Sequence, residues 1–331
     1  MGSREKISGE PLIQGTFAWP RKLLFLPDAL GSKHRISFDL VQGEISLPSF
    51  PPSNAPSDLL PPEAGFSPGK IDWGMVLTRP IGLSLVKVVG VSVFVNSEAA
   101  EDSNPPSLHM IAIDFAQGLD PWLYRMRAWL AAIMETDLVI EAPSDLPGSI
   151  PEGLALYEKM ESNPSQLPTP HRPANWNLIE PSGQAWHLDS TRAVPLSAWS
   201  RAIRLANAKQ TLPVERELLS SARSALTRGS TRLAVIEAGT AAEVSLGGAL
   251  RARLRSTKEP AAIDRLVRRK GLSQLHQLAK KFAVPCPQSI EDLLSTRNAA
   301  AHRAETPSAE AASKAMTIAS EIVNIHSPLP P

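Results

Sequence analysis

The sequence predicts two domains of different class: an α+β N-terminal domain rich in strands and proline-rich loops, followed by an all-α up-and-down helical bundle. The prolines divide the chain, since 23 of 31 precede residue 213 and only four lie between 214 and 327. That density excludes long helices and suits strands and irregular loops. After residue 213, apolar residues recur at helical spacing. We expect domains over residues 1–194 and 213–326, a helical linker over 195–212 and a proline-rich tail over 327–331.

Runs of β-branched residues bounded by Pro, Gly, Asn or Ser predict the strands of the first domain. The expected strands are Arg35–Asp39, Gly43–Leu47, Gly82–Val95 (bent, or a hairpin near Gly90), Leu108–Phe115, Asp137–Glu141 and Ala185–Leu188. One helix is expected among them, with Asp120 as N-cap and Pro121 in the first turn. A second helix, Pro195–Lys209, is expected to bridge the two halves. The proline-rich stretches Pro48–Pro68 and Pro143–Pro173 are expected to be long loops.

Start and stop signals divide the second domain into helices. The expected helices are Val214–Thr227 ending before Gly229, one from Ser230 to about Arg255, Ala261–Lys270, Gln274–Phe282 capped by Ser273, one opened by the capping box at Ser289 and running to His302, and a last one starting at Thr306-Pro307.

Composition limits the class of protein. Residues 213–331 hold 17 Lys and Arg against 11 Asp and Glu, although the whole chain has a net charge of only +1. A basic second domain permits a polyanionic partner. The single cysteine, Cys286, excludes an intrachain disulfide framework and a cysteine-based zinc cluster. We expect a cytoplasmic protein that binds no membrane, metal or cofactor.

The segment from Arg297 to His302, Arg-Asn-Ala-Ala-Ala-His, concentrates chemistry near the end of a predicted helix. Arg297 and His302 lie about 140° apart around a regular helix, whereas Asn298 and His302 share a face, so the Asn298 amide is a candidate for orienting the imidazole. Arg297 therefore joins them only if the helix frays near His302, or if a second copy of the chain supplies the complementary residue. The surrounding alanines would allow a second helix to approach closely, which favours a symmetric dimer.

These residue types suit the cleavage of a phosphodiester. Arginine binds phosphate oxygens bidentately, so Arg297 is a candidate for holding the scissile phosphate. Histidine titrates near neutral pH, so His302 can take the ribose 2′-OH proton or protonate the leaving oxygen. Attack by the 2′-OH needs no metal and leaves a 2′,3′-cyclic phosphate and a 5′-OH.

The helical pattern of residues 213–326, with its Arg-x4-His motif and polar Asn298 after the arginine, resembles the HEPN family. The resemblance implies a bundle that dimerises through the motif helices and cleaves RNA without metal, often as a toxin or antiviral effector. It also implies that Glu237 or Glu243 approaches the site and orients Arg297 or favours protonation of His302. Inactive family members that only bind partners imply the alternative, a non-catalytic module that dimerises or binds a partner or nucleic acid.

Other signals are weaker. The basic residues Arg251, Arg255, Arg268, Arg269 and Lys270 are candidates for an RNA backbone track or for plain solvent exposure. His276 fits an apolar pattern and is expected to be packed. The first domain carries no catalytic motif, and an enzyme site there would need a polar pocket around His187 and Asp189. We expect it to control the bundle, with a regulatory ligand or an antitoxin as candidate partners.

Overall fold

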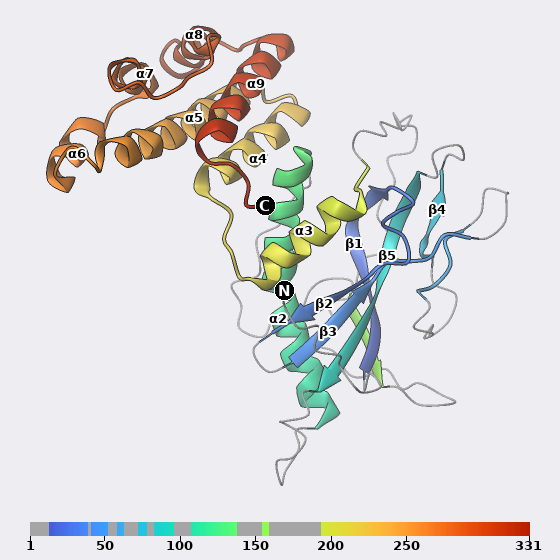
Figure 1. Cartoon of the computed structure of the whole chain (residues 1–331). Helices are drawn as coiled ribbons and strands as arrows, with labels where there is room; N and C mark the ends of the chain where they lie inside the picture. Colours follow the sequence, from blue (N-terminus) through green and yellow to red (C-terminus); the bar gives the residue numbers. More distant parts are fainter. Residues whose placement is uncertain are drawn as a thin grey trace. The chain divides into compact units, whose positions relative to one another are not determined.

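The computed structural model describes residues 13–38, 41–51, 58–62, 72–77, 83–95, 107–137, 154–158 and 193–331. A strand-rich antiparallel region comes first and a helical region follows it (Figure 1). The chain divides into two units. The N-terminal unit comprises residues 1–127 and 140–210, and the C-terminal unit comprises residues 128–139 and 211–331.

An antiparallel sheet forms the described core of the N-terminal unit. Its strands are β1 (Ile13–Phe25), β2 (Lys33–Ser37), β3 (Val41–Ser46), β4 (Gly74–Val76), β5 (Ser84–Val95) and β6 (Leu154–Glu158). The order is β2-β3-β5-β1-β6, and β4 also pairs with β5. Within β1 the register with β5 shifts between Ala18 and Leu23. Pro20 lies in that interval, as expected for a residue that cannot donate to the ladder.

The structure confirms three of the six expected strands, because β2, β3 and β5 overlap the predicted ranges. The alternative of a hairpin near Gly90 is wrong, since β5 runs through Gly90 as one strand paired to β3. The strands expected at Ala185–Leu188 and over nearly all of Asp137–Glu141 lie outside the described residues, as does most of Pro143–Pro173. The prediction missed β1, β4 and β6.

The strand expected at Leu108–Phe115 and the helix start expected at Asp120 are both wrong. One helix, α2 (Leu108–Met134), runs through both positions and contains Pro121. Ser107 provides the start, because its Oγ accepts a hydrogen bond from the Met110 backbone N at 3.3 Å. Ile111, Ala112, Phe115 and Ala116 are buried at helical spacing, so burial on one helix face outweighs their local strand propensity. From Ala128 onward α2 belongs to the C-terminal unit.

The first part of α2 is fixed to the N-terminal unit by aromatic contacts and one side-chain hydrogen bond. Phe115 packs edge-on against Phe38, with ring centroids 5.3 Å apart. Trp122 Nε1 donates to Asn207 Oδ1 at 2.8 Å. Asn207 ends the helix α3 (Leu196–Asn207), which confirms the helix predicted over Pro195–Lys209.

Helix α5 (Thr231–Leu254) is the centre of the C-terminal unit. It contacts α4 (Val214–Thr227), α6 (Pro260–Val267), α7 (Leu272–Lys281), α8 (Ile290–His302) and α9 (Ala309–His326). Side chains from all six helices form one buried cluster, including Leu219, Leu246, Ile263, Leu275, Leu293 and Ile322. Among the described residues α5 is also the one helix long and apolar enough to cross a bilayer, with 56% of its apolar window buried. The core helix of a soluble bundle satisfies the same criterion.

The predicted helix order of this unit is confirmed, and the differences lie at the helix ends. The helix expected over Ala261–Lys270 ends earlier, since α6 stops at Val267. Helix α7 begins at Leu272 after Gly271, so the cap expected at Ser273 is wrong. Ser289 does precede α8, but its side chain makes no capping hydrogen bond. Helix α9 begins after Ser308, whose Oγ accepts from the Ala311 backbone N at 3.1 Å, two residues later than expected.

Candidate active site

Helix α8 carries the Arg297–His302 motif and ends at its last residue. Ile290, Leu293, Leu294 and Ala300 are buried and fix the helix to the bundle. After His302 the backbone turns away, with Ala304 in the left-handed region at φ +54°. His302 therefore occupies the last helical position and is exposed to solvent.

The structure brings Arg297 and His302 together within one chain. Arg297 Nη1 lies 3.4 Å from His302 Nε2. A guanidinium can only donate, so the contact is a hydrogen bond when Nε2 is the unprotonated ring nitrogen. The angular separation of about 140° would keep short side chains apart on a regular helix. The long arginine stem and the position of His302 at the helix end allow the contact.

Glu243, on α5, lies behind Arg297. Its Oε2 is 3.6 Å from Arg297 Nη2 and accepts a hydrogen bond from the Leu272 backbone N at 3.2 Å. Both side chains are partly buried, with exposed fractions of 21% for Arg297 and 29% for Glu243. One carboxylate oxygen therefore serves both the motif arginine and the first residue of α7. That N-terminus has no side-chain cap from its own N-cap residue.

Gly239, one turn earlier on α5, makes room for the arginine stem. A Cβ at Gly239 would lie 2.6 Å from Cγ of Arg297, closer than real Cβ contacts allow. The absence of a side chain at this position lets Arg297 lie directly on the α5 backbone. Arg297 Nε is buried there and has no hydrogen-bond partner within the described part of the chain.

Asn298 and Glu237 are not joined to this cluster. Asn298 is half-buried, and no hydrogen bond between its amide and His302 is formed. One carboxylate oxygen of Glu237, Oε2, is buried without a hydrogen-bond partner among the residues that the structure describes. Of the two glutamates that the family resemblance implied, the structure brings Glu243 to Arg297.

A further arginine, which sequence reasoning missed, holds the end of α8. Arg232 in the first turn of α5 donates from Nε to the Ala300 carbonyl at 2.8 Å. This carbonyl belongs to the last turn of α8, where helix geometry leaves acceptors unsatisfied. No local sequence pattern indicates this contact, because it joins residues 68 positions apart.

The basic residues singled out in the sequence follow α5, α6 and the junction before α7. Arg251 lies 3.9 Å from Asp264, whereas Arg255, Arg268 and Arg269 are exposed and Lys270 is half-buried. Arg265, Arg268 and Arg269 line a surface hollow of about 530 Å³ together with Ala261 and Asp264. The hollow is thus bordered by three guanidinium groups and one carboxylate.

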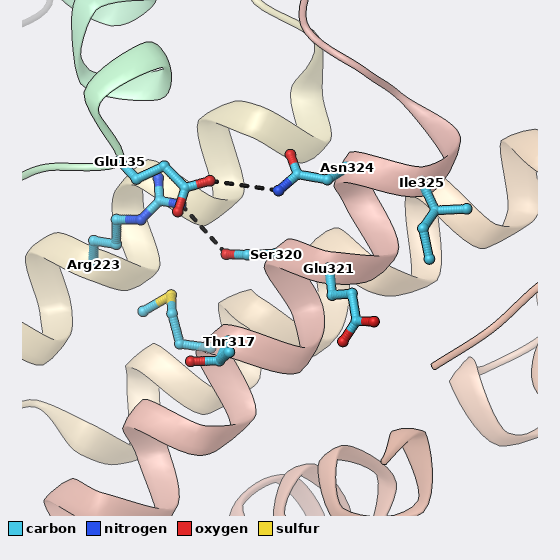
Figure 2. Close-up of a pocket in the computed structure, with 8 residues that line it drawn as sticks. Glu135, Arg223, Thr317, Ser320, Glu321, Asn324 and Ile325 are labelled. Atoms are coloured by element: carbon cyan, nitrogen blue, oxygen red, sulfur yellow. Dashed lines mark hydrogen bonds and ion pairs between the residues drawn. The ribbon is translucent and has the colours of Figure 1, made fainter. Parts of the chain in front are cut away.

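Figure 2 shows a second hollow of about 550 Å³, bordered by the end of α2 and by α4 and α9. Glu135 contacts two other lining residues, with Oε2 3.6 Å from Arg223 Nη2 and Oε1 accepting from Asn324 Nδ2 at 3.5 Å. Arg223 also donates to Ser320 Oγ at 3.3 Å. Burial lowers the pKa of the Arg223 guanidinium and the Glu135 carboxylate opposes that change. Sequence reasoning missed this cluster, because Glu135 and Asn324 are 189 residues apart.

The other two histidines singled out in the sequence are His276 and His187. His276 is buried, as expected, with Nδ1 3.4 Å from Glu291 Oε1. Burial lowers the pKa of His276, Lys280 lowers it further, and Glu291 opposes both effects. His187 and Asp189 lie outside the described residues. Over the described ranges, no three His, Cys, Asp or Glu side chains are grouped to hold a metal ion.

Comparisons with protein-family models, with characterised proteins and with solved structures find no match to this chain.

Proposed function

We propose that the C-terminal unit is a metal-independent endoribonuclease of HEPN type, with Arg297 and His302 as its catalytic pair. The observation that carries the proposal is the 3.4 Å separation between Arg297 Nη1 and His302 Nε2 at an exposed helix end. A permanent cation and an imidazole are thus adjacent, with His302 exposed and Arg297 about one-fifth exposed. Together they can bind a phosphodiester and move a proton at the same place.

The reaction has two parts that these residues serve. The ribose 2′-oxygen attacks phosphorus while His302 Nε2 accepts the 2′-OH proton, after the Arg297 guanidinium has released Nε2 and turned to the phosphate. The bond from phosphorus to the 5′-oxygen breaks, and a second acid protonates the leaving oxygen. The products are a 2′,3′-cyclic phosphate and a 5′-OH. Arg297 stabilises the extra negative charge that develops on the phosphate oxygens.

A homodimer through the α8 helices supplies the second acid. His302 of one copy takes the 2′-OH proton, and His302 of the other copy protonates the leaving oxygen. Ala299, Ala301 and Ala304 are small and at least partly exposed, so a second α8 helix can approach closely. Asn298, half-buried on the same helix, is then available to a substrate or to the second copy. In this arrangement the protein is a toxin or defence effector controlled by its N-terminal unit.

The alternative is a non-catalytic module that dimerises or binds a partner or nucleic acid, and one observation favours it. Glu243 lies 3.6 Å from Arg297 and Arg297 is four-fifths buried, so the guanidinium is partly neutralised before any phosphate arrives. In this alternative the Glu243–Arg297 pair serves the packing of α5, α7 and α8, and His302 is a surface residue.

The deciding experiment is incubation of the purified full-length protein with mixed RNA in EDTA, with the fragment ends mapped. Wild type, Arg297→Ala and His302→Ala are compared with Arg228→Ala, an exposed arginine at the C-cap of α4. We expect cyclic phosphate ends, a loss of about 100- to 10,000-fold in His302→Ala, and no change in Arg228→Ala. Absence of cleavage by a folded wild-type dimer, or equal cleavage by all four proteins, supports the binding module.

A further inference from the structure

Three consecutive cations occupy the junction between α6 and α7. Arg268 and Arg269 are exposed, and Lys270 is half-buried. Within the described part of the chain none of the three forms an ion pair or a side-chain hydrogen bond, unlike Arg251 with its neighbour Asp264. Arg269 has a left-handed backbone, φ +60°, in the turn between the two helices. The junction therefore presents uncompensated positive charge on a sharply turned segment.

The junction adjoins the candidate active site through Glu243. The same atom, Glu243 Oε2, lies 3.6 Å from Arg297 Nη2 and 3.2 Å from the Leu272 backbone N. The α7 N-terminus and the motif guanidinium are therefore separated by a single carboxylate oxygen. Lys270 precedes Leu272 by two residues, so the basic segment lies close in the chain to this shared contact.

The hollow beside the junction fits a phosphate-rich strand. Arg265, Arg268 and Arg269 contribute three charges, and the Asp264 carboxylate is 3.9 Å from Arg251. Among the described residues that line it there is no aromatic side chain on which a base could stack. A volume of about 530 Å³ admits a phosphate with its ribose. Contacts of this kind read the backbone and not the base sequence.

We infer that the α6–α7 junction, through Arg268, Arg269 and Lys270, binds the RNA backbone next to the phosphodiester held by Arg297. The inference rests on the proposed function and names how the substrate is held. Adjacent phosphates are neutralised by the junction, and the scissile phosphate is left to Arg297. The junction therefore confers no base preference on the nucleotides that it contacts. An acidic protein segment is the competing occupant of the same surface.

The test measures binding separately from cleavage. A single-stranded 2′-O-methyl RNA lacks the nucleophilic hydroxyl, so its binding to the full-length protein is measured without reaction over a range of salt concentrations. The variant is Arg268→Gln/Arg269→Gln. Its matched control is Lys280→Gln/Lys281→Gln, which removes the same charge from exposed positions at the other end of α7.

We expect the junction variant to bind RNA about 10- to 30-fold more weakly near 0.1 M salt and to lower the salt slope by about 1.4, since each lost phosphate contact contributes about 0.7. The Lys280/Lys281 control should bind as wild type does, and uridine and adenosine strands should bind alike. In the RNA cleavage assay, the junction variant should have a higher KM than wild type and a kcat that is little changed.

Each failure has its own signature. Equal weakening in both double variants, or none in either, overturns the inference even when wild type cleaves RNA. Wild-type binding without cleavage overturns the nuclease but leaves the junction to be judged by its own variant. Wild type that binds no RNA but binds a polyglutamate peptide through Arg268 and Arg269 overturns the RNA reading in favour of an acidic protein partner.

Discussion

Gly239 on α5 and Arg297 on α8 are in such close contact that a Cβ at the glycine would lie 2.6 Å from Cγ of the arginine. The position of the motif arginine therefore depends on a missing side chain on another helix. A substitution at Gly239 should therefore change the geometry of the site more than the stability of the bundle. Two glycines of α5, Gly239 and Gly248, allow the test.

Gly239→Ala should lower RNA cleavage by about 10- to 100-fold, because a displacement of the order of 1 Å in a binding group has that effect. Its unfolding midpoint should change little, because the alanine improves helix propensity by about 1 kcal/mol while the arginine stem is displaced. Gly248→Ala is the control, since nothing lies within 4 Å of a Cβ there. It should stabilise the protein by up to about 1 kcal/mol and leave cleavage unchanged. Equal activity in both variants would contradict the role assigned to Gly239.

Glu243→Ala should destabilise the C-terminal unit by about 1–2 kcal/mol, because it removes both the α7 cap and the partner of Arg297. Glu243→Gln should lose about half as much, since its amide oxygen still accepts from the Leu272 backbone N. Urea unfolding of the two variants, followed by helical circular dichroism, measures the difference. A loss of the same size in both would mean that the charge, and not the cap, provides the stabilisation.

Acid should destabilise the C-terminal unit through His276. Burial lowers the folded-state pKa of His276 below its unfolded value of about 6.5. Between the two values the unfolded chain binds more protons, so the free energy of unfolding falls as the pH drops below about 6.5. Burial also lowers the pKa of His326, which contributes in the same direction. Thermal unfolding from pH 8 to pH 5 should show a flatter dependence in His276→Gln than in wild type. Parallel curves for the two proteins would exclude His276 as a source of the effect.

Glu135→Gln, in the hollow of Figure 2, should lower the free energy of unfolding of the C-terminal unit by about 1 kcal/mol. The value is modest because solvent screens a carboxylate that is 48% exposed. The cost arises because Arg223, only 12% exposed, keeps its charge and loses its opposite partner. Glu321→Gln is the matched control, since Glu321 lines the same hollow and is exposed. Its change in the free energy of unfolding should stay within about 0.5 kcal/mol. A larger effect at Glu321 than at Glu135 would show that the ion pair is not the stabilising contact.

Local signals predicted the helices of the C-terminal unit well. Pro213 and Gly229 delimit α4 through backbone restrictions that act within a few residues, and the prediction of Val214–Thr227 is confirmed. In the N-terminal unit the decisive contacts are distant. Strand β1 contains Pro20 and is held by pairing to β5, some 70 residues later, so no local pattern identifies it. Helix α2 contains Pro121, which in the sequence indicates a start and in the structure lies in the interior.

The sequence predicted which residues form the candidate site, but it did not predict how their side chains contact one another. The motif residues stand out by type, but the Arg297–His302 contact depends on how far an arginine side chain reaches at a helix end. The bond from Glu243 to the Leu272 backbone N joins two helices that only the folded bundle brings together. A family resemblance suggested Glu243 as one of two glutamates, and packing distinguishes it from Glu237.

The division of α2 between the two units has a practical consequence for truncation. Residues 128–139 belong with residues 211–331, although about 70 residues separate them in the chain. A recombinant fragment that begins at Thr211 would lack Glu135 and leave Arg223 without the carboxylate beside it. A bundle prepared for crystallisation or for toxicity assays should therefore carry the end of α2, either by grafting residues 128–137 through a short linker or by coexpressing them as a peptide.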